Sequence, residues 1–347
     1  MKERHSKIIQ AIIRKSEQVC PDSLELIGLY GSAATGDVHP KSDLDLLILI
    51  RDEQGRRLTD TFILNDVEIG YDLYCTTWEM LERDAACEHA YLAKLMDARI
   101  VYVNNPAAVD RLAALRREAS ARLASDQRYA AAQAALDQAK KLYAECFLSD
   151  SLPHIRTAVG EGILYMMDAL MLYHGRYFKK GTKRAFEELD TLELPFDFQN
   201  MTLAIISSET AEEIRKGMTT LLRTLSEYLI PPTQKAAPSA ENLTGTYEEM
   251  FSNWRNKISE AVGNRDLYAS FMNMVLMGCM MREVASGVDI PTIEPIAGFD
   301  PRDLAQNLRE TDAALAAYEA ECRRAGMEPK RYANLEEFEM RYLGSQS

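Results

Sequence analysis

Apolar residues recur along the chain with two patterns, the spacing of a helix and the short runs of a strand. The first part of the chain contains both patterns. Isoleucines on one helical stripe predict a helix over residues 4–19. Short apolar runs bounded by turn residues predict strands over residues 24–30, 43–50 and 67–75, with a shorter strand over 59–64. Residues 43–50 are apolar at nearly every position, which is typical of a strand buried on both faces. We therefore expect a small mixed sheet of about four strands with helices packed against it.

The helical period dominates from residue 78 onward. Helices are expected over residues 78–96, 107–147, 154–173, 210–229, 248–287 and 301–326. Residues 231–245 contain three prolines and few large apolar side chains, so they are expected to form a linker. The predicted fold class is α+β, with a sheet-containing domain in residues 1–105, a helical domain in 106–230 and a C-terminal helical region in 246–347.

The composition limits the kinds of partner that the chain is expected to bind. The chain has 40 basic and 53 acidic residues, a net charge of -13, which disfavours extended nucleic acid as the main partner because phosphate neutralisation needs clustered cations. The six cysteines are far apart and form no CxxC pair, which is typical of reduced thiols in a cytoplasmic protein. The N-terminal helix mixes charged and apolar residues, so we expect neither a signal peptide nor a membrane anchor.

The candidate chemistry lies in two short motifs at the ends of neighbouring predicted strands. Gly31-Ser32 follows the first strand, and Asp43 and Asp45 stand at the start of the second. Alternation along a strand places the two aspartates on one face, about 6.5 to 7 Å apart, where their carboxylates can share a divalent cation such as Mg²⁺ or Mn²⁺. Gly31 lets the backbone approach a phosphate, and the Ser32 hydroxyl can donate to its oxygens.

This stretch, LYGSAATGDVHPKSDLDLLILI, resembles the signature of the DNA polymerase beta-like nucleotidyltransferase superfamily. The form G-S-A-x-x-G followed by S-D-[IL]-D-L-L is similar to antibiotic nucleotidyltransferases and to small bacterial members of that superfamily. The resemblance covers residues 24–80 and implies that residues 1–105 are a catalytic domain. It also implies an enzyme that uses Mg²⁺ to transfer a nucleoside monophosphate from an NTP, ATP first among them, to an acceptor hydroxyl. Gly31 and Ser32 would then bind the nucleotide.

The family also takes a third carboxylate from a later strand, and two residues here compete for that role. Asp72 in GYDLYC matches the small bacterial members, whereas Glu68 in VEIGY is closer to the antibiotic-modifying members. The two are expected on the same face of one strand, four residues or about 13 Å apart, so they cannot both reach one metal ion. We favour Asp72 as the third metal ligand and as the general base, with Glu68 as the alternative.

A second charged feature follows a strongly apolar predicted helix. The segment RYFKKGTKR carries five cations in nine residues: Arg176, Lys179, Lys180, Lys183 and Arg184. These side chains can complement the C-terminus of a helix on an exposed surface. Alternatively, Lys179 and Lys180 bind the triphosphate or an acidic acceptor.

The acceptor is not specified by any motif. A small hydroxylated molecule, for example an aminoglycoside, is favoured because the acidic chain suits a cationic acceptor and lacks a broad basic groove. Nucleotidylation of a protein or a tRNA 3′ end is an alternative. A different class of function, a non-catalytic nucleotide-binding and helical interaction module, also remains open, as does assembly into a homo-oligomer.

Overall fold

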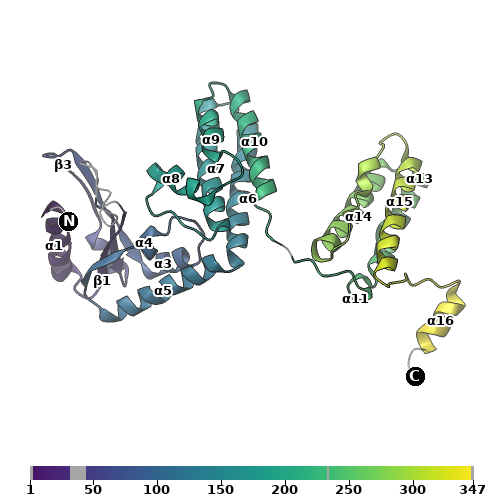
Figure 1. Cartoon of the computed structure of the whole chain (residues 1–347), viewed down its shortest axis with the longest axis horizontal. Coiled ribbons are helices and arrows are strands. Elements are labelled where there is room, and N and C mark those ends of the chain that lie inside the picture. The colour runs from purple at the N-terminus through teal and green to yellow at the C-terminus, as the bar shows by residue number, and fades with distance from the viewer. Residues whose placement is uncertain (1–2, 32–43, 233, 345–347) are drawn as a thin grey trace. The chain divides into compact units, whose positions relative to one another are not determined.

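The computed structural model describes residues 3–31, 44–232 and 234–344, and it divides into two compact units, Met1–Pro231 and Pro232–Ser347 (Figure 1). The strands that the described residues form all lie in the first unit, and the second unit is helical. A small mixed sheet is therefore followed by a large helical region, which confirms the predicted α+β class.

A four-stranded sheet with strand order β5-β2-β1-β6 forms the centre of the first unit. Strand β1 (Leu24–Leu29) pairs antiparallel with β2 (Leu46–Ile50) and with β6 (Arg99–Val103), and β2 pairs parallel with β5 (Cys75–Thr77). Every residue of β1 and β2 is buried, as expected for the central strands of a covered sheet. The predicted mixed sheet is confirmed, although its membership differs, because residues 99–103 had not been expected to form a strand.

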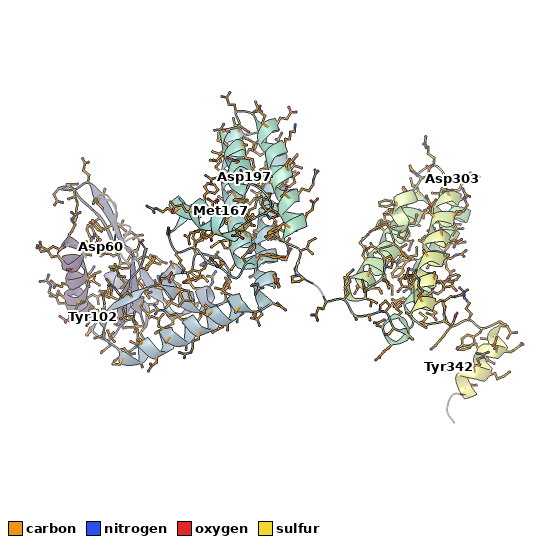
Figure 2. The ribbon with its side chains drawn as sticks, in the orientation of Figure 1. Asp60, Tyr102, Met167, Asp197, Asp303 and Tyr342 are labelled. Carbon is orange, nitrogen blue, oxygen red and sulfur yellow. The ribbon has the colours of Figure 1, made fainter. Side chains whose placement is uncertain are left out.

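The other two predicted strands form a separate two-stranded sheet. Strands β3 (Asp60–Leu64) and β4 (Ile69–Leu73) pair as an antiparallel hairpin, and Figure 2 shows Asp60 at its start. The strand expected over residues 67–75 is interrupted at Tyr74, so that its end pairs with β2 as β5. The expectation of one continuous strand was therefore wrong.

Helix α1 (Glu3–Val19) confirms the first predicted helix. It buries the stripe that contains Ile8, Ile9 and Ile12, and these side chains join a core with strands β1 and β2 and with Tyr71 of the hairpin. The isoleucine spacing therefore identified the face of α1 that packs against the protein.

The helix expected over residues 78–96 is interrupted. Helix α3 (Trp78–Ala85) begins where the Thr77 hydroxyl accepts a hydrogen bond from the Met80 amide at 3.4 Å, and α4 (Ala93–Met96) follows after a loop. Cys87 has a positive φ of 56°, a conformation that an α-helix does not contain. His89 and Tyr91 of the loop over residues 86–92 line the cavity of the candidate site.

The helix expected over residues 107–147 is also two helices, α5 (Pro106–Ala124) and α6 (Gln127–Leu148), which separate at Ser125. Helices α7 (Leu152–Tyr173) and α10 (Ala211–Tyr228) confirm two further predictions, and α10 contacts both α6 and α7. The remaining short elements of this unit are η1 (Glu53–Leu58), η2 (Thr182–Arg184), α8 (Ala185–Leu189), η3 (Asp190–Leu192) and α9 (Phe198–Ser207).

One hydrophobic core joins the sheet to these helices. It runs from Leu26 of β1 and Leu47 of β2 through the apolar face of α5 to Met166 of α7 and Leu225 of α10. Residues 1–105 and 106–230, predicted as two domains, therefore share one core within the first unit.

The second unit has a core of its own, which contains Met277, Met281 and Tyr318. The helix expected over residues 248–287 is broken at Arg265, whose φ is 57°. The elements of this unit are α11 (Ala240–Leu243), α12 (Thr246–Met250), the π-helix η4 (Phe251–Arg255), α13 (Asn256–Asn264), α14 (Leu267–Gly287), η5 (Pro295–Gly298), α15 (Leu304–Arg324) and α16 (Leu335–Gly344), which carries the Tyr342 shown in Figure 2.

The predicted linker contains the boundary between the units, which lies after Pro231. Its later part is not extended chain: α11 lies within it, and the Ala236 amide donates to the Gly287 carbonyl at 2.8 Å. Among the described residues, no helix is both long enough and apolar enough to cross a membrane.

Candidate active site

The site begins where strands β1 and β2 meet. Gly31 follows β1 after Tyr30, Asp45 directly precedes β2, and the Tyr30 amide donates to the Asp45 carbonyl at 3.1 Å. Gly31 has a φ of +64°, and a Cβ at this position would lie 2.0 Å from Oδ2 of the half-buried Asp45. Only glycine fits here, because it tolerates this backbone conformation and leaves room for the carboxylate.

Two residues of the predicted site, Ser32 and Asp43, lie outside the described residues. The structure therefore places one residue of the Gly31-Ser32 pair and one of the two aspartates. Those two residues are in close contact, as the predicted juxtaposition of the motifs requires.

A cavity of about 420 Å³ opens beside Gly31 and Asp45, and three parts of the first unit line it. Besides the ends of β1 and β2, the wall includes Asp84, His89, Tyr91 and Lys94 from the region of α3 and α4. The segment that follows α7 completes the wall with Phe178, Lys179, Lys180 and Gly181. The structure thus brings Lys179 and Lys180 to the same cavity as Gly31 and Asp45.

Helices α3 and α4 and the loop between them present a small charge cluster to this cavity. Asp84 is 6% exposed, and its carboxylate lies 3.3 Å from Nε2 of His89 and 3.5 Å from Nζ of Lys94. No sequence pattern predicted these three residues, because a buried acid with nearby cations is recognisable only after the chain has folded.

The lysine pair lies on a loop held by main-chain hydrogen bonds. The amides of Lys179 and Lys180 donate to the Glu188 carboxylate at 2.8 to 3.1 Å. Nζ of Lys180 is 3.2 Å from Glu187, and Nζ of Lys179 is 5.5 Å from the centre of the Tyr177 ring. Both side chains are exposed, so their charges are available to a ligand in the cavity as well as to these neighbours.

One further acid contacts the loop that lines the cavity. Asp168 of α7 is 6% exposed, and its Oδ1 accepts a hydrogen bond from the Ala90 amide at 3.0 Å. Burial raises the pKa of Asp168 to about 6, although the Ala90 amide and the nearby His89 oppose the shift. Burial, with a smaller contribution from the Asp168 charge, also raises the pKa of Tyr91.

Asp72 lies near the end of β4, and Glu68 lies in the turn before that strand begins. Asp72 is exposed, and its Oδ1 accepts a hydrogen bond from the Thr61 hydroxyl at 3.3 Å. In the parallel pairing of β2 with β5, Ile48 is opposite Cys75, and Asp45 and Asp72 each stand three residues before that pair. Asp72 itself belongs to β4 in the separate two-stranded sheet, and it does not line the cavity beside Gly31 and Asp45.

Glu68 lies in the turn between β3 and β4, with a φ of 53°. The expectation that it shares a strand face with Asp72 was wrong, because the strand begins only at Ile69. The choice of Asp72 as the third carboxylate stays a prediction. In the part of the chain that the structure describes, which does not include Asp43, no three His, Cys, Asp or Glu side chains form a metal-binding group.

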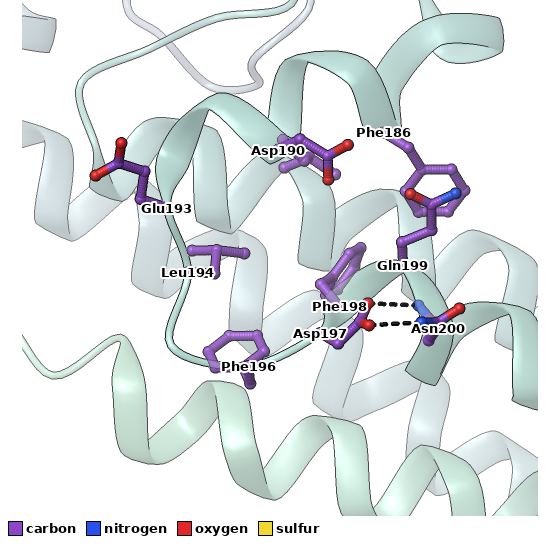
Figure 3. Close-up of a pocket in the computed structure, with 10 residues that line it drawn as sticks. Phe186, Asp190, Glu193, Leu194, Phe196, Asp197, Phe198, Gln199 and Asn200 are labelled. Atoms are coloured by element: carbon purple, nitrogen blue, oxygen red, sulfur yellow. Dashed lines mark hydrogen bonds between the residues drawn. The ribbon is translucent and has the colours of Figure 1, made fainter.

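A second cavity, of about 460 Å³, lies beside η3 and the start of α9 (Figure 3). Asp190 and Glu193 line it together with aromatic side chains, while Asp197 caps α9 by accepting the Asn200 amide at 2.9 Å. Neither Gly31 nor Asp45 lines this cavity, so we place the candidate active site at the first one.

A match to a known family covers the part of this site that lies on β1 and β2. The family model of a nucleotidyltransferase domain matches residues 7–98, and this match supports nucleotidyl transfer as the general activity of that segment. The match includes Gly31, Asp45 and Asp72 but ends before Lys179. A comparison with curated proteins finds no match. Among solved structures, a nucleotidyltransferase-like protein from Exiguobacterium sibiricum 255-15 aligns at 15% identity over 94% of this chain and 96% of its own, with a TM-score of 0.33.

Proposed function

We propose that this protein transfers a nucleoside monophosphate from an NTP, ATP being our first choice, to a hydroxyl group of an acceptor. The single observation that carries this proposal is the cavity that joins Gly31 and Asp45 of the nucleotidyltransferase domain to the Lys179 and Lys180 segment. An acidic residue beside a glycine turn suits a metal-bound triphosphate, and the facing cations suit its phosphate oxygens.

The reaction balances as a simple substitution at the α-phosphorus. The acceptor oxygen forms a bond to the α-phosphorus, and the bond from that phosphorus to the bridging oxygen of the β-phosphate breaks, releasing pyrophosphate. The hydroxyl proton passes to a carboxylate, for which we propose Asp72, and then to water. Lys179 and Lys180 would hold the phosphates in line for the attack, so that orientation contributes much of the rate.

The described part of the site fits a divalent cation. Carboxylate oxygens are the donors that Mg²⁺ and Mn²⁺ prefer, and the missing side chain of Gly31 lets the Asp45 carboxylate lie against the glycine turn. We propose that Asp45 holds the ion together with Asp43 and Asp72. A bound Mg²⁺ supplies charge neutralisation for the triphosphate and the leaving pyrophosphate.

For the acceptor we propose a small hydroxylated molecule, with a cationic one such as an aminoglycoside favoured by the net charge of -13. The dispersed cysteines support a cytoplasmic location. Neither an extended nucleic acid nor a membrane is part of this proposal.

The test measures pyrophosphate release from ATP and Mg²⁺ with panels of aminoglycosides, other hydroxylated small molecules, tRNA and protein. We expect release with one class of acceptor and its loss in Asp45→Asn, whereas Asp137→Asn, an exposed acid on α6, should retain it. Nucleotide binding without release for every acceptor class would instead favour the non-catalytic binding module.

A further inference from the structure

Asp168 is an ionisable side chain that the proposed reaction does not use, yet it is buried next to the cavity. It lies in the C-terminal half of α7, is 6% exposed, and accepts a hydrogen bond from the Ala90 amide at 3.0 Å. Burying a carboxylate costs free energy, so the hydrogen bond from the Ala90 amide to Asp168 is expected to hold a part of the structure in place.

The bond is the first link in a chain that reaches the cavity wall. Ala90, which is fully buried, accepts the Phe178 amide through its carbonyl at 2.8 Å. The rings of Tyr91 and Phe178 stack with their centres 4.9 Å apart. Tyr91 and Phe178 line the cavity, and Lys179 is the next residue along the chain. Asp168 thus connects α7 to one loop, and that loop holds the next.

We infer that Asp168 is a positioning residue that fixes the two loops carrying Tyr91 and the Lys179-Lys180 pair opposite Gly31 and Asp45. The inference rests on the proposed function for what the wall binds, namely the phosphates of a nucleotide. Asp168 itself touches no reacting group and acts through Ala90 and Phe178.

The experiment compares three substitutions at this position in the full chain. Asp168→Asn keeps an oxygen that can accept the Ala90 amide, whereas Asp168→Ala removes the acceptor. Asp168→Leu also removes it but fills the space, which preserves packing if the alanine variant does not fold. Glu161→Ala, an exposed acid on the same helix, is the matched control.

Two measurements are made on each variant. Calorimetry with Mg²⁺ and α,β-methylene-ATP should give a Kd raised by about tenfold in Asp168→Ala and Asp168→Leu, the low end of the loss caused by removing an outer partner of a binding group. Asp168→Asn and the control should stay close to the wild type. Hydrogen exchange without nucleotide should become faster at the Ala90 and Phe178 amides only in the variants that lack the acceptor.

Unchanged exchange at both amides in Asp168→Leu would overturn the inference, and so would a loss of affinity in Asp168→Asn as large as that in Asp168→Leu. A wild type that does not bind the nucleotide would reject the proposed function instead. The exchange rates would then still decide whether Asp168 holds the two loops.

Discussion

Gly31→Ala is the sharpest test of the geometry at the site, because the structure predicts a collision with one identified atom. The new Cβ would lie 2.0 Å from Oδ2 and 2.7 Å from Cγ of Asp45. Ordinary contacts begin near 3.4 Å, so the carboxylate must retreat by roughly 1.4 Å or the backbone must move. The φ of +64° adds about 1 to 2 kcal/mol of backbone strain for alanine.

The displacement should affect activity more than stability. A catalytic group misplaced by about 1 Å lowers the rate by about 100-fold, which corresponds to about 2.7 kcal/mol of transition-state stabilisation. We therefore expect Gly31→Ala to lose about 100-fold in kcat/KM for pyrophosphate release from ATP, with the acceptor that the screen identifies. Mg²⁺-dependent nucleotide affinity should fall as well, because Asp45 is a proposed metal ligand.

Gly326→Ala is the matched control. Gly326 has a φ of +77° with no atom within 4 Å of an added Cβ, so alanine there meets the backbone strain without the collision. It lies in the second unit and should retain wild-type kcat/KM. The reasoning is refuted if Gly31→Ala remains folded, as judged by thermal unfolding, and keeps kcat/KM within threefold of the control.

Three further predictions concern individual side chains. Asp72→Asn should abolish pyrophosphate release and Glu68→Gln should leave most of it, because we propose Asp72 as the third metal ligand and the general base. The opposite result would transfer the role to Glu68. Burial raises the pKa of Asp168 from 3.8 to about 6, so the folded state binds this proton more tightly than the unfolded state. The free energy of unfolding of the first unit should therefore gain roughly 3 kcal/mol as the pH falls through 6 towards 4, and urea titrations should show that Asp168→Asn lacks this gain; equal pH profiles would contradict it. Cys279 is exposed while the other five cysteines are buried, so iodoacetamide should modify Cys279 first in the native protein, as peptide mass spectrometry can establish; earlier labelling of a buried thiol would disagree.

The sequence predicted well those elements whose buried positions follow a local pattern of apolar residues. Strands β1 and β2 are unbroken apolar runs, and the stripe on α1 identifies its buried face. Strand β6 was missed because five residues with partial burial do not distinguish a strand from the turn of a helix. Its place depends on pairing with β1, 70 or more residues earlier in the chain.

The sequence also predicted one part of the candidate site and missed another. The contact of Gly31 with Asp45 follows from two motifs at adjoining strand ends, so the sequence could anticipate it. Lys179 and Lys180 stood out as a cationic cluster, but their place at the cavity depends on the hydrogen bond between Phe178 and Ala90, which no local pattern records. The Asp84 cluster likewise exists only through tertiary packing.

The continuous core of the first unit sets a limit on how this protein can be rearranged by recombination. Because Leu26 and Leu47 share their core with α10, a nucleotidyltransferase domain cut after residue 98 would expose apolar surface that the later helices cover. The second unit, whose core is its own, can be gained, lost or replaced as a block at the Pro231-Pro232 junction.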